Sequence, residues 1–166
     1  MEQRRVILPG RVVGIEQLVA SVQQERRSGK SIALANGCFD LLHVGHVRYL
    51  LAAAAVADLL VVAVNGDESV RLLKGEGRPL APELERAELV ASIRGVDFVT
   101  IFHDSTVGPL IERLRPDLQC KGTDYTADTV PEAALVRSYG GEVVIVGDPK
   151  DHSTSDLVEK LRRSGS

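Results

Sequence analysis

Cysteine is scarce in this sequence, and tryptophan is absent. The 166 residues include only Cys38 and Cys120. Two cysteines are too few for a disulfide framework, and their spacing is not that of a metal-binding Cys-x-x-Cys pair. We therefore expect a reduced protein in the cytoplasm. Aromatic residues make up only 4% of the chain against 44% for all hydrophobic residues, so we expect an interior of Val, Leu, Ile and Ala.

The sequence also lacks an excess of one charge and a long uncharged apolar run. The 20 Lys and Arg residues stand against 23 Asp and Glu residues, which gives a net charge of −3. This balance disfavours a nucleic-acid partner. Arg48 and Asp58 interrupt the most apolar region, residues 47–64. A charge near the middle of a bilayer costs about 2.5–3.5 kcal/mol, so we expect a helix and a buried strand there and no membrane span.

The order of apolar patterns along the chain predicts the fold. Ile15, Leu18, Val19 and Val22 recur at helical spacing, which predicts an N-terminal helical extension at about 15–29. Strands are expected at 31–35, 58–64, 98–101, 117–121 and 142–146, and helices at 44–57, 82–94 and 108–114. A helical pattern also follows each of the last two strands, the second of them ending in 157–161. Apolar strands separated by helices indicate a parallel sheet covered on both faces. We expect a single domain over residues 1–166, a Rossmann-like, doubly wound α/β fold with a parallel five-stranded sheet.

Sheets of this kind bind ligands at the carboxyl ends of their strands, near the point where the strand order reverses. The candidate site therefore consists of the segments that follow the expected strands, which are 36–46, 65–78, 103–106, 121–125 and 148–155. Lys121 lies directly at such a strand end and precedes Gly122. This position favours a ligand-binding role for the lysine.

Segment 36–46 is the most informative of the five. It has neither the glycine spacing of a dinucleotide-binding loop nor the Gly-Lys-Ser/Thr of a Walker A loop. His43 and His46 stand three residues apart where a helix is expected to begin, so both side chains lie on one helix face. The unpaired N–H groups of the first helical turn and the two imidazoles would together bind an anion. Gly45 would let that anion approach the backbone closely.

Two other interpretations of the histidine pair are open. The pair could hold a metal ion, but zinc usually needs a third and a fourth ligand, and no H-E-x-x-H pattern follows. The two residues could also be unrelated histidines that lie on the surface or cap a helix.

A resemblance to a known family favours the anion-binding interpretation. Gly37-Cys38-Phe39-Asp40 and His43-Val44-Gly45-His46 resemble the signature of the nucleotidyltransferase superfamily, whose H-x-G-H motif the two histidines match. Within it, the chain resembles the D-glycero-β-D-manno-heptose 1-phosphate adenylyltransferases most closely, from about Ile15 to the C-terminus. Further matching segments are 63–67, 73–79, 96–97, 116–117, 121–125, 140–143 and 153–154, together with Arg86.

The resemblance implies a reaction and its partners. An oxygen of D-glycero-β-D-manno-heptose 1-phosphate would attack the α-phosphorus of ATP, giving ADP-heptose, for lipopolysaccharide or another glycan, and pyrophosphate. Mg²⁺ is expected as a cofactor held mainly through the nucleotide phosphates, with no metal ligand assigned to the chain. The resemblance also implies a homodimer in the cytoplasm. Two alternatives stay open: a cytidylyltransferase acting on glycerol 3-phosphate or another small phosphate ester, and a non-catalytic nucleotide-binding module.

The resemblance also assigns roles to individual residues. The expected catalytic residues are His43, His46, Lys74 and Lys121, with His46 at the α-phosphate. The expected nucleotide-binding residues are Asn36, Gly37, Cys38, Phe39, Asp40, Gly45, Gly122, Ser153 and Thr154. The expected substrate-binding residues are Asn65, Asp67, Arg86 and Asp124.

Several of these residues carry a more specific expectation. Asp40 is expected to orient its loop by hydrogen bonds and not to act as a base. Cys38 is expected to be a small buried residue and not a nucleophile, and Lys74 to lie in a glycine-bearing loop. Ser153 and Thr154 are expected to cap the last helix, to contact phosphate, or both. His152 departs there from the apolar residue that the superfamily carries.

Overall fold

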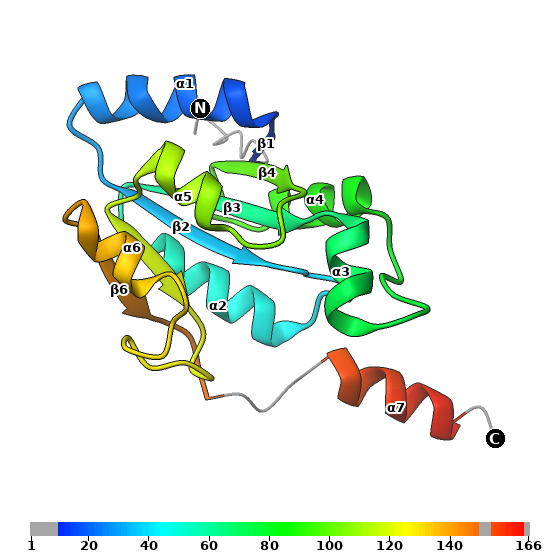
Figure 1. The fold of residues 1–166 in the computed structure, drawn as a ribbon. Helices are drawn as coiled ribbons and strands as arrows, with labels where there is room; N and C mark the ends of the chain where they lie inside the picture. The colour runs from blue at the N-terminus through cyan, green and yellow to red at the C-terminus, as the bar shows by residue number, and fades with distance from the viewer. Residues whose placement is uncertain (1–9, 150–153, 165–166) are drawn as a thin grey trace, which may run out of the picture.

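The sheet confirms the predicted α/β class and has one strand more than expected. The computed structural model describes residues 10–149 and 154–164. Its strands are all parallel and lie in the order β1-β4-β3-β2-β5-β6 (Figure 1). Their bounds are Arg11–Val12 for β1, Ile32–Gly37 for β2, Leu59–Asn65 for β3, Phe98–Phe102 for β4, Leu118–Lys121 for β5 and Glu142–Ile145 for β6.

The strand that the sequence did not predict is β1, so the sheet has six strands and the expected number of five was wrong. β1 is only two residues long and lies at the edge of the sheet, where Arg11 pairs with Phe98 of β4. Two exposed residues carry no apolar periodicity, which explains why the pattern of the sequence missed them.

The described ranges contain seven helices. Their bounds are Ile15–Arg27 for α1, Val44–Ala54 for α2, Asp67–Lys74 for α3, Glu83–Ala91 for α4, Gly108–Leu114 for α5, Ala133–Ser138 for α6 and Thr154–Ser164 for α7. α3 was expected to be loop. Its two leucines, Leu72 and Leu73, are both exposed, and Val70 is the one apolar residue that α3 buries, so the apolar pattern does not indicate an amphipathic helix. None of the helices described is long and apolar enough to cross a membrane.

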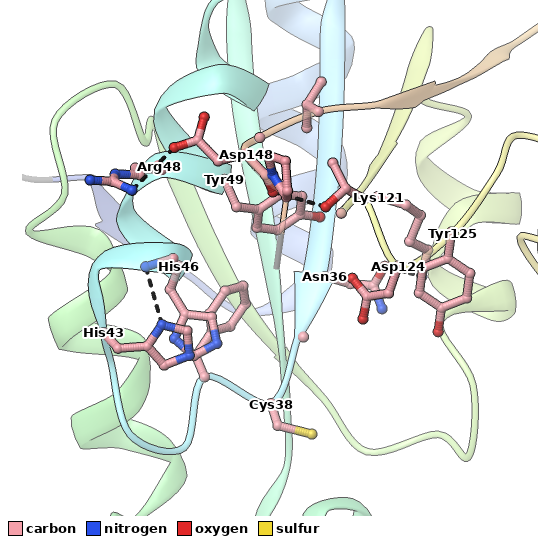
Figure 2. A pocket seen from close by; sticks show the side chains of 18 of the residues that line it. Asn36, Cys38, His43, His46, Arg48, Tyr49, Lys121, Asp124, Tyr125 and Asp148 are labelled. Atoms are coloured by element: carbon pink, nitrogen blue, oxygen red, sulfur yellow. Dashed lines mark hydrogen bonds and ion pairs between the residues drawn. The ribbon is translucent and has the colours of Figure 1, made fainter. Parts of the chain in front are cut away.

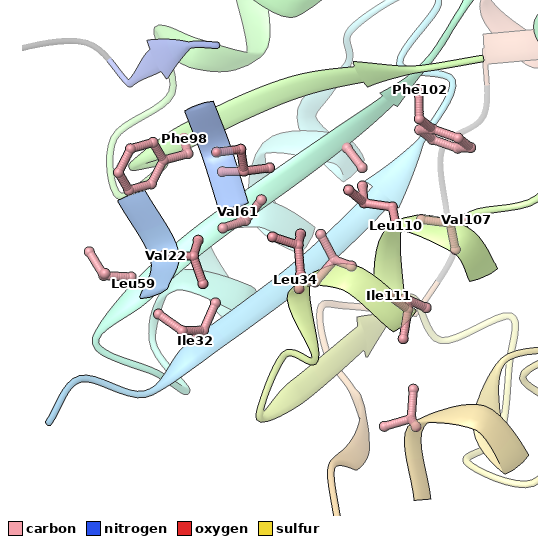
Figure 3. Packing of buried hydrophobic residues seen from close by; sticks show 14 of the residues in the cluster. Val22, Ile32, Leu34, Leu59, Val61, Phe98, Phe102, Val107, Leu110 and Ile111 are labelled. Atoms are coloured by element: carbon pink, nitrogen blue, oxygen red, sulfur yellow. The ribbon is translucent and has the colours of Figure 1, made fainter. Parts of the chain in front are cut away.

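The core forms two layers, one on each face of the sheet. Neighbouring residues along a strand point to opposite faces. One face packs Ile32, Leu34 and Val61 against α1, α5 and α6 (Figure 3). The opposite face packs Leu60 and Val62 against α2 and α4. Because both faces are covered, all seven residues of β3 are buried, which accounts for the unbroken apolar run before its last residue, Asn65.

The strand order reverses beside β2. β2 pairs with β3 on one side and with β5 on the other. The chain adds β3 and β4 toward one edge and then crosses over to add β5 and β6 toward the other. The segments that leave β2 and β5 therefore diverge at the carboxyl ends of these strands, which is where a doubly wound sheet opens a crevice.

Truncation of a core leucine tests this packing. Leu34→Ala should lower the free energy of unfolding by about 2–5 kcal/mol, because Leu34 is fully buried and its loss leaves a cavity. Urea denaturation followed by circular dichroism measures the change. Leu72→Ala is the matched control, since Leu72 is 78% exposed, and it should leave the midpoint unchanged. Equal losses in the two variants would contradict the assignment of Leu34 to the core.

Candidate active site

A cavity of about 410 Å³ lies at the reversal of strand order. The carboxyl ends of β2, β3 and β5 contribute Asn36, Asn65 and Lys121 to its lining. Figure 2 shows His43 and His46 on one side of the cavity and Asn36, Lys121 and Tyr125 on the other. The residues along its lining are Asn36, Gly37, Cys38, Phe39, His43, Gly45, His46, Arg48, Tyr49, Asn65, Lys74, Lys121, Gly122, Thr123, Asp124, Tyr125, Val146, Gly147, Asp148 and Pro149.

The two histidines lie at the start of α2 and stack on each other. His43 is the N-cap residue, and its Nδ1 accepts a hydrogen bond of 3.1 Å from the Gly45 N–H. The rings of His43 and His46 lie 3.9 Å apart between centroids (Figure 2). The Phe39 ring packs against that of His46 in an edge-type arrangement, with 5.3 Å between the centroids. The capping interpretation thus holds for His43, and the Gly45 N–H expected to face an anion bonds to this ring instead.

The cap determines which nitrogen of His43 carries a hydrogen. A ring nitrogen that accepts a hydrogen bond has no hydrogen of its own, so the neutral ring of His43 carries its hydrogen on Nε2. His43 can therefore donate from Nε2 without being protonated to the imidazolium.

Lys121 forms the opposite side of the site. Its Nζ donates a hydrogen bond of 2.9 Å to Asn36 Oδ1 and lies 3.3 Å from Glu132 Oε2. The same amide oxygen accepts a second hydrogen bond of 3.0 Å from Gln119 Nε2. The Tyr125 ring centroid lies 5.6 Å from Nζ. Lys121 is nearly buried, so these groups hold its ammonium in one place.

Lys74 is the last residue of α3 and not a residue of the loop that follows. The helix ends at Gly75, whose φ of +91° is accessible to glycine at little cost. The side chain of Lys74 is exposed and lines the cavity. A cation here can approach a ligand held by the histidines.

Asp40 anchors the loop after α3 to the loop after β2. Its Oδ1 accepts a hydrogen bond of 2.6 Å from the Leu80 N–H, and its Oδ2 accepts one from Arg78 Nε. Burial alone would raise the pKa of this carboxyl, but the bonds from Leu80 and Arg78 outweigh it and hold the pKa below its usual range. Asp40 does not line the cavity, and its contacts agree with the orienting role expected for it.

Arg86 lies in a different place from the one expected. The sequence suggested a substrate contact, but Arg86 is fully buried on α4 and does not line the cavity. Its guanidinium donates to the carbonyl oxygens of Cys38, Asn65 and Ala81 and to Asp67 Oδ1, at 2.6–2.9 Å. A buried guanidinium needs such acceptors, and here all of them come from the chain itself. Arg86 therefore joins the ends of β2 and β3 from beneath the site.

The fold and this geometry can now be compared with known proteins. Residues 34–160 match the model of the cytidylyltransferase-like family. The chain belongs to the cytidylyltransferase-like family. Two curated relatives, each named "Bifunctional protein HldE", are 47% identical to it: the protein of Syntrophotalea carbinolica over 88% of this chain and that of Geotalea uraniireducens over 92%. The chain spans only 30–31% of the length of these two relatives.

A solved structure agrees with this membership. The crystal structure of the lipopolysaccharide core biosynthesis protein from Thermoplasma volcanium superposes with a TM-score of 0.63 and is 27% identical in sequence. The match covers 74% of this chain and 100% of that one. The similarity therefore extends over the whole of that chain and most of this one.

Most of the residues expected in this cytidylyltransferase-like site come together in the cavity. The expected residues that line it are Asn36, Gly37, Cys38, Phe39, His43, Gly45, His46, Asn65, Lys74, Lys121, Gly122 and Asp124. Asp40, Asp67 and Arg86 lie outside the lining. Ser153 lies outside the described residues, as does the side chain of Thr154, whose backbone begins α7.

The cavity also contains residues to which the sequence gave no role. Arg48 of α2 forms an ion pair of 3.2 Å with Asp148, and Thr123 Oγ1 donates to the Asp148 carbonyl at 2.8 Å. Gly147 has a φ of +92° and lies against the Tyr49 backbone, where an added Cβ would come within 3.3 Å of the Tyr49 Cα. Segments 121–125 and 148–155 were candidates because they follow strands, and that position is the signal that indicated Thr123 and Asp148.

Cys38 was expected to be buried, but it lines the cavity and is only partly buried. It does not have the properties of a nucleophile. Burial raises the pKa of the Cys38 thiol, so the thiol is protonated at neutral pH. Within residues 10–149 and 154–164, no group of three or more His, Cys, Asp and Glu side chains is arranged to hold a metal ion.

Removal of the Asp40 charge tests the anchor between the two loops. Asp40→Asn should lower the free energy of unfolding at pH 7 by about 1.5–3 kcal/mol, the typical contribution of hydrogen bonds to a charged group. Because the folded pKa is lowered, this stabilisation is present above the usual carboxyl pKa of about 4 and is lost as the pH falls through the folded value. Denaturation curves at several pH values should therefore converge for wild type and variant in acid.

The exposed Asp104 supplies the control for this experiment. Asp104→Asn should match wild type at every pH, because none of the hydrogen bonds described above depends on it. A stability gap between wild type and Asp40→Asn that keeps its full size well below pH 4 would contradict the role of the carboxylate charge.

Proposed function

We propose that this chain is an adenylyltransferase that condenses ATP with D-glycero-β-D-manno-heptose 1-phosphate to give ADP-heptose and pyrophosphate. The observation that carries the proposal is the meeting of the H-x-G-H histidines with Lys74 and Lys121 around one cavity. Membership of the cytidylyltransferase-like family supports the reaction class. The resemblance to heptose 1-phosphate adenylyltransferases and the lipopolysaccharide core protein of similar structure support the sugar substrate.

The reaction needs charge stabilisation more than it needs a base. An oxygen of the sugar phosphate forms a bond to the α-phosphorus of ATP, and the bond from that phosphorus to the β-phosphate oxygen breaks. The attacking phosphate monoester is already largely anionic at neutral pH, so no residue has to remove its proton. The protein contributes by holding two anions together and by binding the charge that develops on the transferred group.

The two sides of the cavity divide this work. His43 donates from Nε2 to a triphosphate oxygen, and His46 donates to the α-phosphate in the transition state. Lys121 and Lys74 offset the repulsion between the two substrates. Asn65 and Asp124 line the cavity, and in this proposal they contact hydroxyl groups of the sugar. Arg86 and Asp67 support the site from outside the cavity.

Mg²⁺ would enter this site with the nucleotide. Bound to the triphosphate, it would neutralise part of the charge on the phosphates and on the leaving pyrophosphate. Asp124 and Asp148 are carboxylates of the lining that suit the water shell of such an ion. The homodimer, the cytoplasmic location and the phosphate contacts of Ser153 and Thr154 stay predictions.

An assay of pyrophosphate release tests the reaction and the substrate together. Purified protein with Mg²⁺ receives ATP or CTP, each with the heptose 1-phosphate, glycerol 3-phosphate or ethanolamine phosphate. We expect release with ATP and the heptose 1-phosphate alone. Release with CTP would indicate a cytidylyltransferase, and no release with any pair would favour a non-catalytic nucleotide-binding module.

Loss of the second histidine tests the mechanism. His46→Ala should lower kcat by about 10²–10³, as expected for the loss of one donor to transition-state charge. His103→Ala is the control, because His103 is exposed and pairs with Glu83 outside the cavity, and it should leave kcat unchanged. Steady-state kinetics with saturating ATP measures both. Undiminished turnover of His46→Ala would remove His46 from the mechanism.

A further inference from the structure

Glu132 is a buried acid beside a site for anions. It lies outside the cavity lining, and its side chain is only 12% exposed. Its Oε2 lies 3.3 Å from the Nζ of Lys121. A carboxylate at this position repels phosphate groups, so its presence calls for a compensating role.

The side chain of Glu132 does not cap the helix that it precedes, α6. It is the N-cap residue of α6, a position where side-chain oxygens often accept a hydrogen bond from the first turn. Its side chain makes no such capping bond. The carboxylate is directed instead across the fold to β5, where Lys121 is the last residue.

The side chain of Lys121 needs more than one partner to stay in one place. A lysine has four rotatable side-chain bonds, and its ammonium is a compact point charge without a preferred direction. Asn36 Oδ1, 2.9 Å from Nζ, provides one fixed acceptor, and Gln119 holds that amide oxygen in turn. Glu132 provides a carboxylate from a different element, which attracts Nζ as an ion pair without a hydrogen bond. A hydrogen-bond acceptor and a counterion from separate elements define the position of Nζ, which one alone does not.

We propose that Glu132 is a positioning residue that holds the ammonium of Lys121 against Asn36, in the place where it contacts the reacting phosphates. The proposal rests on the adenylyltransferase function proposed above. Glu132 touches no substrate and acts only through Lys121. Its charge favours the position of the lysine and disfavours the phosphates, so its loss should affect turnover more than nucleotide binding.

Kinetic constants distinguish this role from a structural one. Glu132→Gln keeps the shape and removes the charge, and it should lower kcat by about tenfold while the KM for ATP does not rise. Glu132→Asp keeps the charge on a shorter side chain and should recover part of kcat. Asp128→Asn is the matched control from the same segment, since Asp128 is 86% exposed and pairs with Arg137, and it should equal wild type.

A double-mutant cycle tests whether Glu132 acts through the lysine. In a Lys121→Ala background, Glu132→Gln should cause no further loss of kcat, because the group that it positions is gone. A tenfold loss in that background as well would overturn the proposal. A rise in the KM for ATP with unchanged kcat would also overturn it.

A measurement without turnover separates this proposal from the proposed function. A held and shielded ammonium gives a lysine NH₃⁺ signal in ¹⁵N-edited NMR, and Lys121→Ala identifies the signal of Lys121 by its disappearance. We expect the signal in wild type and Asp128→Asn and its loss in Glu132→Gln. Its absence from wild type, or its persistence in Glu132→Gln, would overturn the positioning role. Dependence of the signal on Glu132 in a protein that releases no pyrophosphate would reject the enzyme function and retain the ion pair.

Discussion

The site depends on one constraint, which is the position of β2 between β3 and β5. Parallel pairing on both sides fixes where β2 ends, and the reversal of strand order leaves no crossover segment above that end. Asn36 and Lys121 meet because β2 and β5 are neighbours, although 85 positions separate them in the sequence. The start of α2 lies over the same point because its helix returns across the sheet from β2. The strand topology therefore determines where the cavity lies, and the side chains only line it.

Buried charges make this topology rigid at the carboxyl edge. Arg86 binds three carbonyl oxygens that strand pairing leaves unused, at the ends of β2 and β3 and before α4. Asp40 does the same for N–H groups of the segment before α4. A buried ion without partners is strongly unfavourable, so each of these residues fixes several backbone positions at once. The loop that carries Cys38 and the loop that follows α3 thus connect to a fixed base, although they have little regular structure of their own.

Elements that depend on the local pattern of residues could be predicted from the sequence. Features that depend on contacts between residues far apart in the sequence could not. The five longer strands and the start of α2 follow from apolar runs and from the residues at their ends. α3 was not predicted because Leu72 and Leu73 face solvent, whereas a prediction from the apolar pattern assumes that such residues are buried. Arg86 looked like a residue for substrate because nothing nearby in the sequence shows that its four acceptors converge in the fold. No sequence pattern indicated a role for Glu132, since the role proposed for it depends on its ion pair with Lys121, a residue of another element.

The donors on the two sides of the cavity are held in position in different ways. The ring of His43 is fixed by its own backbone, because the bond from Gly45 both caps α2 and directs Nε2–H away from the helix. Lysine cannot be fixed so locally, because its ammonium lies at the end of a flexible chain, and the fold supplies Asn36 and Glu132 from two other elements. Donors that are oriented before the substrate binds need no reorganisation when charge develops on the transferred phosphate. The Glu132 carboxylate beside an anion site is consistent with this need for orientation. Without it, the Lys121 ammonium would be free to adopt positions from which it stabilises the bound substrates and not the transition state.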